Sequence, residues 1–140
     1  MDVKGYDHRE DLLYHPEFCW VKPEDDDIVS VGLNDFYCKL AGEISYVDMP
    51  EEGDEITKDE RIGTVETGKW VGKLIAPVSG EIVEINEDVE DDPATINEKP
   101  YDTWLFKVKL SDKSQLDELM KGDDAVKWLE KEIEEHKDEQ

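Results

Sequence analysis

Residues 63–80 read GTVETGKWVGKLIAPVSG, and this stretch decides the fold. Apolar residues flank the pair Gly68-Lys69 on both sides, which is the pattern of two strands joined by a tight hairpin. Glycine adopts the positive φ of such turns most readily, so we expect Gly68 to close the hairpin. Lys69 then stands at the tip, with its ammonium far from any core. On composition and spacing alone, such a lysine is an ordinary solvated charge.

Strands are predicted on both sides of this hairpin. Alternating or β-branched runs occupy residues 28–32, 42–48, 80–85 and 103–110. In the second run, the alternation places Ile44 and Tyr46 on one face and Ser45 and Val47 on the other. LAGEI at residues 40–44 is echoed by VSGEI at residues 78–82, which indicates two halves stacked on one core or a coincidence between two strands.

Helices are predicted between and after the strands. Residues 34–41 form a short helix capped by Asn34. In the C-terminal part, apolar residues recur at helical spacing (Ala125, Val126, Trp128, Leu129, Ile133), with Asp123 or Asp124 as the N-cap. A preceding short helix holds Leu116, Leu119 and Met120. Residues 1–14 are predicted to be a loose arm or one short helix, ahead of a single domain over residues 15–140.

The charge excludes several classes of function. Sixteen Lys and Arg face 39 Asp and Glu, which gives a net charge of −23, so nucleic acid and anionic membranes are poor partners. No run approaches the roughly 20 apolar residues of a membrane span, and no basic segment precedes an apolar one at the N-terminus. We therefore expect a cytoplasmic protein. The acid excess serves either to steer partners or only to keep the protein soluble.

Enzymatic and metal-binding motifs are not found in the sequence. Cys19 and Cys38 are not a C-x-x-C pair, so a thiol redox enzyme is a weaker hypothesis than two unreactive buried thiols. His8, His15 and His136 lack metal-ligand spacing relative to the cysteines, and we expect no metal. Neither a phosphate-binding G-x-x-x-x-G-K-[ST] loop nor a G-x-S-x-G nucleophile turn occurs.

A family resemblance rests on the hairpin. VETGK at residues 65–69, then seven residues, then PVSGE at residues 77–81, resembles the V-E-S-x-K, seven residues, P-V-S-G-E pattern of the glycine cleavage system H-protein family. Trp20-Val21 resembles the start of the family's first strand. VGLNDF at residues 31–36 resembles its V-G-I-T-D-Y, residues 40–44 its L-G-D-I, and residues 117–129 its closing helices. The resemblance spans residues 15–130, roughly.

The resemblance implies a fold that is mainly β, with short helices. In this family it is a β-sandwich, or lipoyl (hammerhead) domain, of two quasi-symmetric halves, here with C-terminal helices from about residue 112. It further implies a monomeric carrier, not an enzyme. In this carrier Lys69 is the lipoyl attachment site and lipoate the covalent cofactor. Gly68 supplies the context of the turn, and Glu66 either helps the modifying enzyme recognise it or is an ordinary strand-end carboxylate.

The implied partners act in turn. A lipoate ligase or lipoyl transferase modifies the lysine, and glycine decarboxylase then loads an aminomethyl group on the arm. An aminomethyltransferase receives that group, and dihydrolipoamide dehydrogenase reoxidises the dithiol. Biotin is disfavoured, because the biotin version of the fold usually has methionines beside the lysine, where this chain has Gly68 and Trp70.

Several positions depart from the family pattern. Phe18-Cys19-Trp20 stands where H-E-W is frequent, and Cys38 stands where a polar residue is usual. Gly68 replaces a common valine, and Trp70 replaces a small residue. These departures put the set of partners in doubt. The alternative is an H-protein-like lipoate-binding carrier of a heterodisulfide-reductase-like sulfur oxidation system, in which the arm carries sulfur intermediates.

Overall fold

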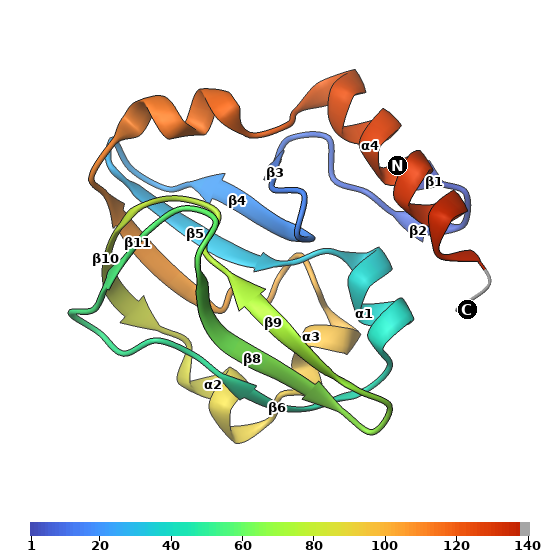
Figure 1. Ribbon diagram of the computed structural model, residues 1–140, viewed down its shortest axis with the longest axis horizontal. Coiled ribbons are helices and arrows are strands. Elements are labelled where there is room, and N and C mark those ends of the chain that lie inside the picture. Colours follow the sequence, from blue (N-terminus) through green and yellow to red (C-terminus); the bar gives the residue numbers. More distant parts are fainter. Residues whose placement is uncertain (138–140) are drawn as a thin grey trace.

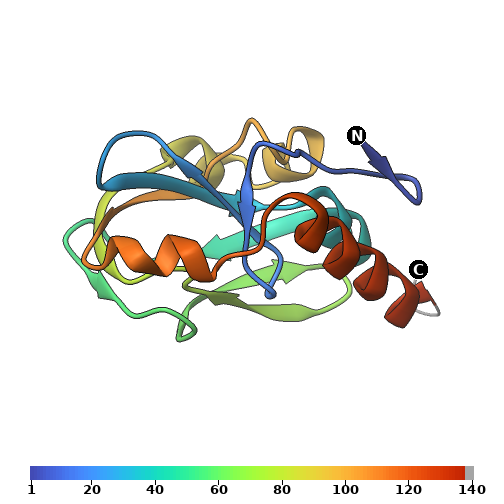
Figure 2. The ribbon, with the colours of Figure 1, turned by 90° about the horizontal axis from the view of Figure 1, so that it is seen from above.

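Two antiparallel sheets form the main layers of the computed structural model, which describes residues 1–137 (Figure 1). The larger sheet has the order β3 (Leu13–Tyr14), β4 (Cys19–Pro23), β5 (Ile28–Leu33), β11 (Phe106–Leu110), β10 (Gly80–Ile85) and β7 (Glu55–Ile56). The smaller sheet has the order β6 (Ile44–Asp48), β8 (Arg61–Thr67) and β9 (Val71–Ile75). Figure 2 shows β8 and β9 (green) as a layer apart from β4 and β5 (blue).

Short helices connect and flank the sheets. They are α1 (Asp35–Ala41), α2 (Glu87–Asp91), α3 (Thr95–Glu98), a 3-10 helix (Lys113–Glu118) and α4 (Gly122–Glu135). The main core includes Val31, Phe106 and Val108 from the larger sheet and Val65 and Leu74 from the smaller one, all buried. The expected mainly-β sandwich with C-terminal helices is confirmed.

Of the two predicted N-caps, that of α1 is confirmed and that of α4 is wrong. Asn34 caps α1 as expected, because its side-chain oxygen accepts a hydrogen bond of 2.9 Å from the Tyr37 N–H. The predicted N-cap of α4 is wrong: the helix begins at Gly122, with Lys121 in the cap position and no side-chain cap bond. Asp123 and Asp124 lie inside the first turn instead, where a negative charge complements the helix dipole.

Strand β6 departs from the simple alternation that its sequence predicts. Ile44 and Val47 are buried, whereas Ser45 and Tyr46 are exposed. The pairing register with β8 shifts between Ile44 and Tyr46, which is a β-bulge. After the extra residue, each side chain points to the opposite face from the one that simple alternation gives. The prediction that Ile44 and Tyr46 share one face of the sheet is therefore wrong.

The two copies of the internal repeat open one strand in each sheet. Gly42 ends α1 just before β6, with a φ of 87°, and Gly80 is the first residue of β10. A Cβ at Gly80 would collide with the backbone oxygen of Lys109 on the neighbouring strand β11. The glycine of each copy is thus required locally, by a left-handed backbone at Gly42 and by close strand packing at Gly80.

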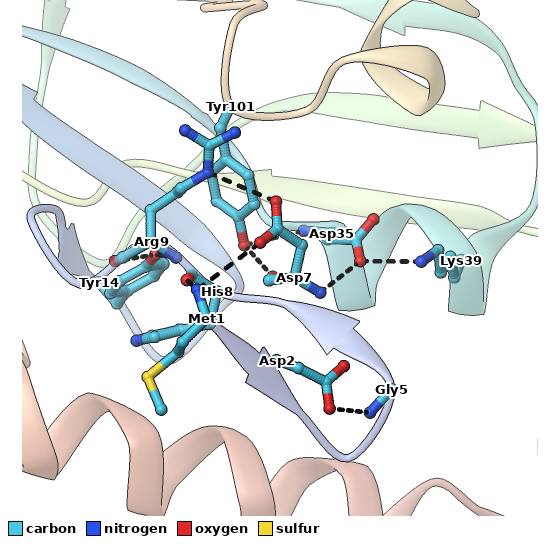
Figure 3. A network of polar contacts seen from close by, with 10 residues as sticks. All are labelled: Met1, Asp2, Gly5, Asp7, His8, Arg9, Tyr14, Asp35, Lys39 and Tyr101. Atoms are coloured by element: carbon cyan, nitrogen blue, oxygen red, sulfur yellow. Dashed lines mark hydrogen bonds and ion pairs between the residues drawn. The ribbon is translucent and has the colours of Figure 1, made fainter.

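Residues 1–14 form neither a loose arm nor a helix. They contain β1 (Asp2–Val3), β2 (Tyr6–Asp7) and β3, and Val3 is buried against α4. Figure 3 shows the polar contacts of this segment. The Asp7 N–H donates to the Asp35 carboxylate at 2.8 Å, and the Tyr101 hydroxyl donates to the Asp7 carbonyl at 2.8 Å.

These contacts fix the segment to α1 and to the loop before β11. The Tyr101 hydroxyl also accepts a hydrogen bond of 3.2 Å from the Asp35 N–H, and Lys39 pairs with the Asp35 carboxylate at 3.0 Å. The bounds of the carrier domain, residues 15–140, stay a prediction, and its last three residues lie outside the described part of the chain.

Candidate functional site

The hairpin between β8 and β9 forms as the sequence predicts. Val65 pairs with Gly72 and Glu66 pairs with Val71, and the Thr67 N–H donates to the Trp70 carbonyl at 2.9 Å. Gly68 and Lys69 are the two residues of the turn. Figure 1 shows this turn at one end of the molecule, on the same side as α1 and the end of α4. The rigid ladder thus holds Lys69 at a defined place on the surface.

Gly68 does not close the turn in the way its sequence suggests. Its φ is not positive, and a Cβ there would meet no atom within 4 Å. Instead, the Thr67 hydroxyl oxygen accepts hydrogen bonds from the Lys69 N–H at 3.1 Å and from the Trp70 N–H at 3.2 Å. Our expectation missed this role, although threonine at the first position of a turn is a known local signal.

The Lys69 side chain is exposed but does not project straight into solvent. It lies near the end of α1, since a Cβ built at Gly42 would be 3.2 Å from Lys69 Cε and 3.5 Å from Nζ. No hydrogen bond or ion pair engages its amine within residues 1–137. The glycine at position 42 therefore leaves room for the lysine stem, and the amine is open to a reagent from outside.

Glu66 lies on β8, three residues before the lysine. Its neighbours across the sheet are Tyr46 on β6 and Val71 on β9, and its backbone carbonyl accepts a hydrogen bond of 3.1 Å from the Ser45 hydroxyl. The structure thus places Gly68 and Lys69 together in the turn and leaves Glu66 on the adjoining strand.

A groove of about 330 Å³ lies beside the hairpin. Six residues line it: Phe18, Tyr37, Leu40, Lys69, Trp70 and His136. The rings of Tyr37 and Trp70 have their centroids 6.0 Å apart, and those of Phe18 and Tyr37 are 5.7 Å apart. Sequence reasoning did not assign Tyr37, Leu40 or His136 to the site, because they come from α1 and from the residue that follows α4.

A larger hollow than this groove lies elsewhere on the described surface. It has a volume of about 770 Å³, and it is lined by residues of the segments 46–52 and 85–91, six of them acidic. Lys69 is not part of it. The size of a hollow therefore does not identify the site in this protein, and the hairpin does.

The two cysteines are not arranged for redox chemistry. Both are free and buried, and burial raises the pKa of each thiol to about 12, with a smaller contribution from Glu17 at Cys19 and from Asp35 at Cys38. Thiol reactivity requires the thiolate, which a pKa this high makes negligible at neutral pH. Unreactive buried thiols are thus the better interpretation.

His8 and His15 serve the structure. His15 Nε2 lies 2.6 Å from the Asp59 carboxylate, while its Nδ1 accepts a hydrogen bond of 3.1 Å from the Glu17 N–H. His8 is buried and stacks on Tyr14 with 4.8 Å between ring centroids; burial is the main reason that its pKa is lowered. In residues 1–137 no three His, Cys, Asp or Glu side chains are grouped so that they could hold a metal ion.

Known proteins have similar sequences and a similar fold. The family model described as "Glycine cleavage H-protein" matches residues 12–132. The glycine cleavage system H protein of Staphylococcus carnosus is 47% identical over 115 residues, which cover 81% of this chain and 90% of that protein. The probable glycine cleavage system H protein of Thermococcus gammatolerans is 40% identical over 131 residues, which cover 93% and 98%.

A solved structure agrees with these relatives. The crystal structure of a glycine cleavage system H protein from Mycobacterium marinum superimposes with a TM-score of 0.70 at 35% identity, over 74% of this chain and 87% of that one. The two-layered β fold and these relatives define a carrier protein of the lipoyl-domain class, not a catalyst. More narrowly, the chain belongs to the glycine cleavage H-protein family.

Proposed function

We propose that this chain is a lipoyl carrier of the glycine cleavage system, modified at Lys69. In this function it takes an aminomethyl group from glycine decarboxylase and delivers it to an aminomethyltransferase, and dihydrolipoamide dehydrogenase then restores the arm. The observation that supports the proposal best is the placement of Lys69, at the tip of a rigid hairpin with an amine that no other group in the described part of the chain engages. The protein acts as a cytoplasmic monomer. Among residues 1–137 no helix is long and apolar enough to span a membrane.

The residues around Lys69 fit a lipoyl group. Its Nζ is the atom that would form the amide, and the groove beside it has apolar and aromatic walls of the kind that tolerate an aliphatic chain. Thr67 fixes the backbone of the turn, and Gly42 leaves the lysine stem free of a neighbouring side chain. When bound, the group supplies a disulfide that accepts and releases the aminomethyl unit.

Intact-mass measurement tests the attachment. The protein incubated with lipoate, ATP and a lipoate ligase should gain the mass of one lipoyl group. Lys69→Arg keeps the charge but removes the acceptor amine, so this variant should gain nothing. Lys73→Arg, an exposed lysine on the same hairpin, should behave as the wild type. The proposal is wrong if the wild type stays unmodified under conditions that modify a known carrier.

A second function is favoured by one feature of the site. Phe18 and Trp70, two of the positions that depart from the family pattern, both line the groove beside Lys69. Changed walls are compatible with a different cargo, such as the sulfur intermediates of a heterodisulfide-reductase-like oxidation system. A reconstituted glycine cleavage assay with the enzymes of the same organism separates the two. Turnover supports the first function, and no transfer by the lipoylated protein supports the second.

A further inference from the structure

Exposed apolar side chains gather at the hairpin that bears Lys69. Within the described residues, five large hydrophobic side chains are exposed: Met1, Tyr46, Trp70, Val71 and Val83. Three of the five lie on the small sheet near the turn, with exposed fractions of 52% at Tyr46, 42% at Trp70 and 62% at Val71. In a chain with 39 acidic residues, this gathering marks a candidate contact surface.

These three side chains lie on opposite faces of the hairpin. Trp70 covers Gly72, where a Cβ would be 2.9 Å from the indole ring, and contacts Tyr37 on α1. Val71 points to the other face, since neighbouring residues of a strand alternate. Tyr46 lies on that face too, because Tyr46 and Val71 are the two partners of Glu66 across the sheet. Lys69 thus stands between an indole on one side and, on the other, Val71 and Tyr46 with Glu66 between them.

The indole is held in place before any partner arrives. Both backbone polar groups of Trp70 are bonded to Thr67, its N–H to the hydroxyl oxygen and its carbonyl to the N–H. The ring rests on the Gly72 backbone, which has no side chain to displace it, and on Tyr37. A large aromatic side chain that is fixed in advance loses little conformational entropy on binding, and such residues often dominate the energy of an interface.

We propose that Trp70 on one face, with Val71 and Tyr46 on the other, is the docking surface for the enzyme that acylates Lys69. The inference rests on the proposed function. In that reaction the neutral Nζ attacks the carbonyl carbon of lipoyl adenylate, an amide bond forms, AMP leaves with the bonding electrons, and the nitrogen gives up a proton to solvent. The amine itself must therefore enter the active site of the enzyme.

The geometry of lysine brings the enzyme into contact with the residue next to Lys69 in that step. The stem of lysine is only four carbons long, and neighbouring Cα atoms are about 3.8 Å apart, so an enzyme that encloses Nζ also covers Trp70. Enzymes that act on a completed arm reach it at a greater distance from the hairpin. The acylating enzyme is thus the partner that this surface fits. In that enzyme, apolar slots on both sides of the channel that admits Lys69 receive the exposed side chains.

Steady-state lipoylation by the lipoate ligase of the same organism tests the surface. Trp70→Ser should raise KM at least about tenfold with kcat within about twofold, as expected for a dominant interface residue. Trp70→Phe keeps an aromatic ring and should retain most of the efficiency. Val71→Ser should raise KM severalfold, whereas the matched change Val83→Ser, an exposed valine on β10 in the other sheet, should not. Circular dichroism checks that each variant is folded.

A competition experiment separates docking from chemistry. The Lys69→Arg chain cannot be acylated and should inhibit modification of the wild type, whereas the double variant with Trp70→Ser should inhibit at least about tenfold more weakly. Equal inhibition by the two chains overturns the docking surface but leaves the proposed function standing. If Trp70→Ser does not fold, the variants Trp70→Phe, Val71→Ser and Val83→Ser decide. An unchanged KM in Val71→Ser refutes the docking surface, and so does an equal rise of KM in Val83→Ser. A wild type that is never acylated refutes the proposed function instead.

Discussion

Trp20 and Gly32 are matched to each other in size. The indole of Trp20 is buried, its Nε1–H donates to the Pro100 carbonyl at 3.0 Å, and its ring lies over Gly32 on the adjacent strand β5. A Cβ at Gly32 would be only 2.6 Å from Trp20 Nε1, and closer still to the ring carbons. At Gly68, by contrast, the same added atom would meet nothing within 4 Å.

This contrast predicts opposite effects of one substitution. Gly32→Ala should lower the free energy of unfolding by about 1–3 kcal/mol, because the indole is pinned at its nitrogen and cannot move aside. Gly68→Ala should be neutral or stabilise by up to about 1 kcal/mol, since alanine restricts the unfolded chain and fits the native backbone. Urea denaturation monitored by circular dichroism measures both. Equal midpoints for the two variants would contradict the packing described here.

Single residues also show what the sequence could predict about the site. Asn34 was identifiable as a cap because a polar side chain before a helix commonly has this role, although the same signal failed for Asp123 and Asp124 at α4. Gly68 was misinterpreted because glycine permits a positive φ but does not impose it, and the neighbouring threonine already satisfied the turn. A residue that forms a bond is therefore a firmer local signal than one that merely tolerates a conformation.

One hydroxyl group stabilises the turn of the β8–β9 hairpin. Thr67→Val should leave the Lys69 and Trp70 N–H groups without their acceptor and weaken the turn by about 1 kcal/mol. Thr67→Ser keeps the oxygen and should preserve the turn. Amide hydrogen exchange at Lys69 and Trp70 is the measurement. Faster exchange is expected in the valine variant only, and equal exchange in both variants would show that the hydroxyl does not stabilise the turn.

At the scale of elements, the strands were predictable and their irregularities were not. The runs that became β5, β10 and β11 have β-branched or alternating residues that leave little choice. The bulge in β6 has no comparable signature, because it depends on how β8 pairs with it across the sheet. The short strands β1 and β2 were missed for a related reason: their stability comes from α1, α4 and Tyr101, all distant in sequence.

The charge of the whole molecule has an expected effect on stability. With a net charge of −23, repulsion among carboxylates opposes the compact state. Raising NaCl from about 0.01 to 0.2 M shortens the Debye length from about 30 Å to under 10 Å, so the free energy of unfolding should rise. A matched series in choline chloride controls for specific cation binding. A fall with salt in both series would show that the ion pairs outweigh the repulsion.

The order of strands in the larger sheet also affects how the chain folds while it is being synthesised. Strand β5 lies between β4, which precedes it directly, and β11, which comes more than 70 residues later. Until residue 110 has left the ribosome, one edge of β5 has no partner, and its valines have no complete core. Pairings between such distant segments form slowly. The nascent chain therefore exposes an unpaired strand edge for most of its translation, which is the period in which a chaperone would have most to protect.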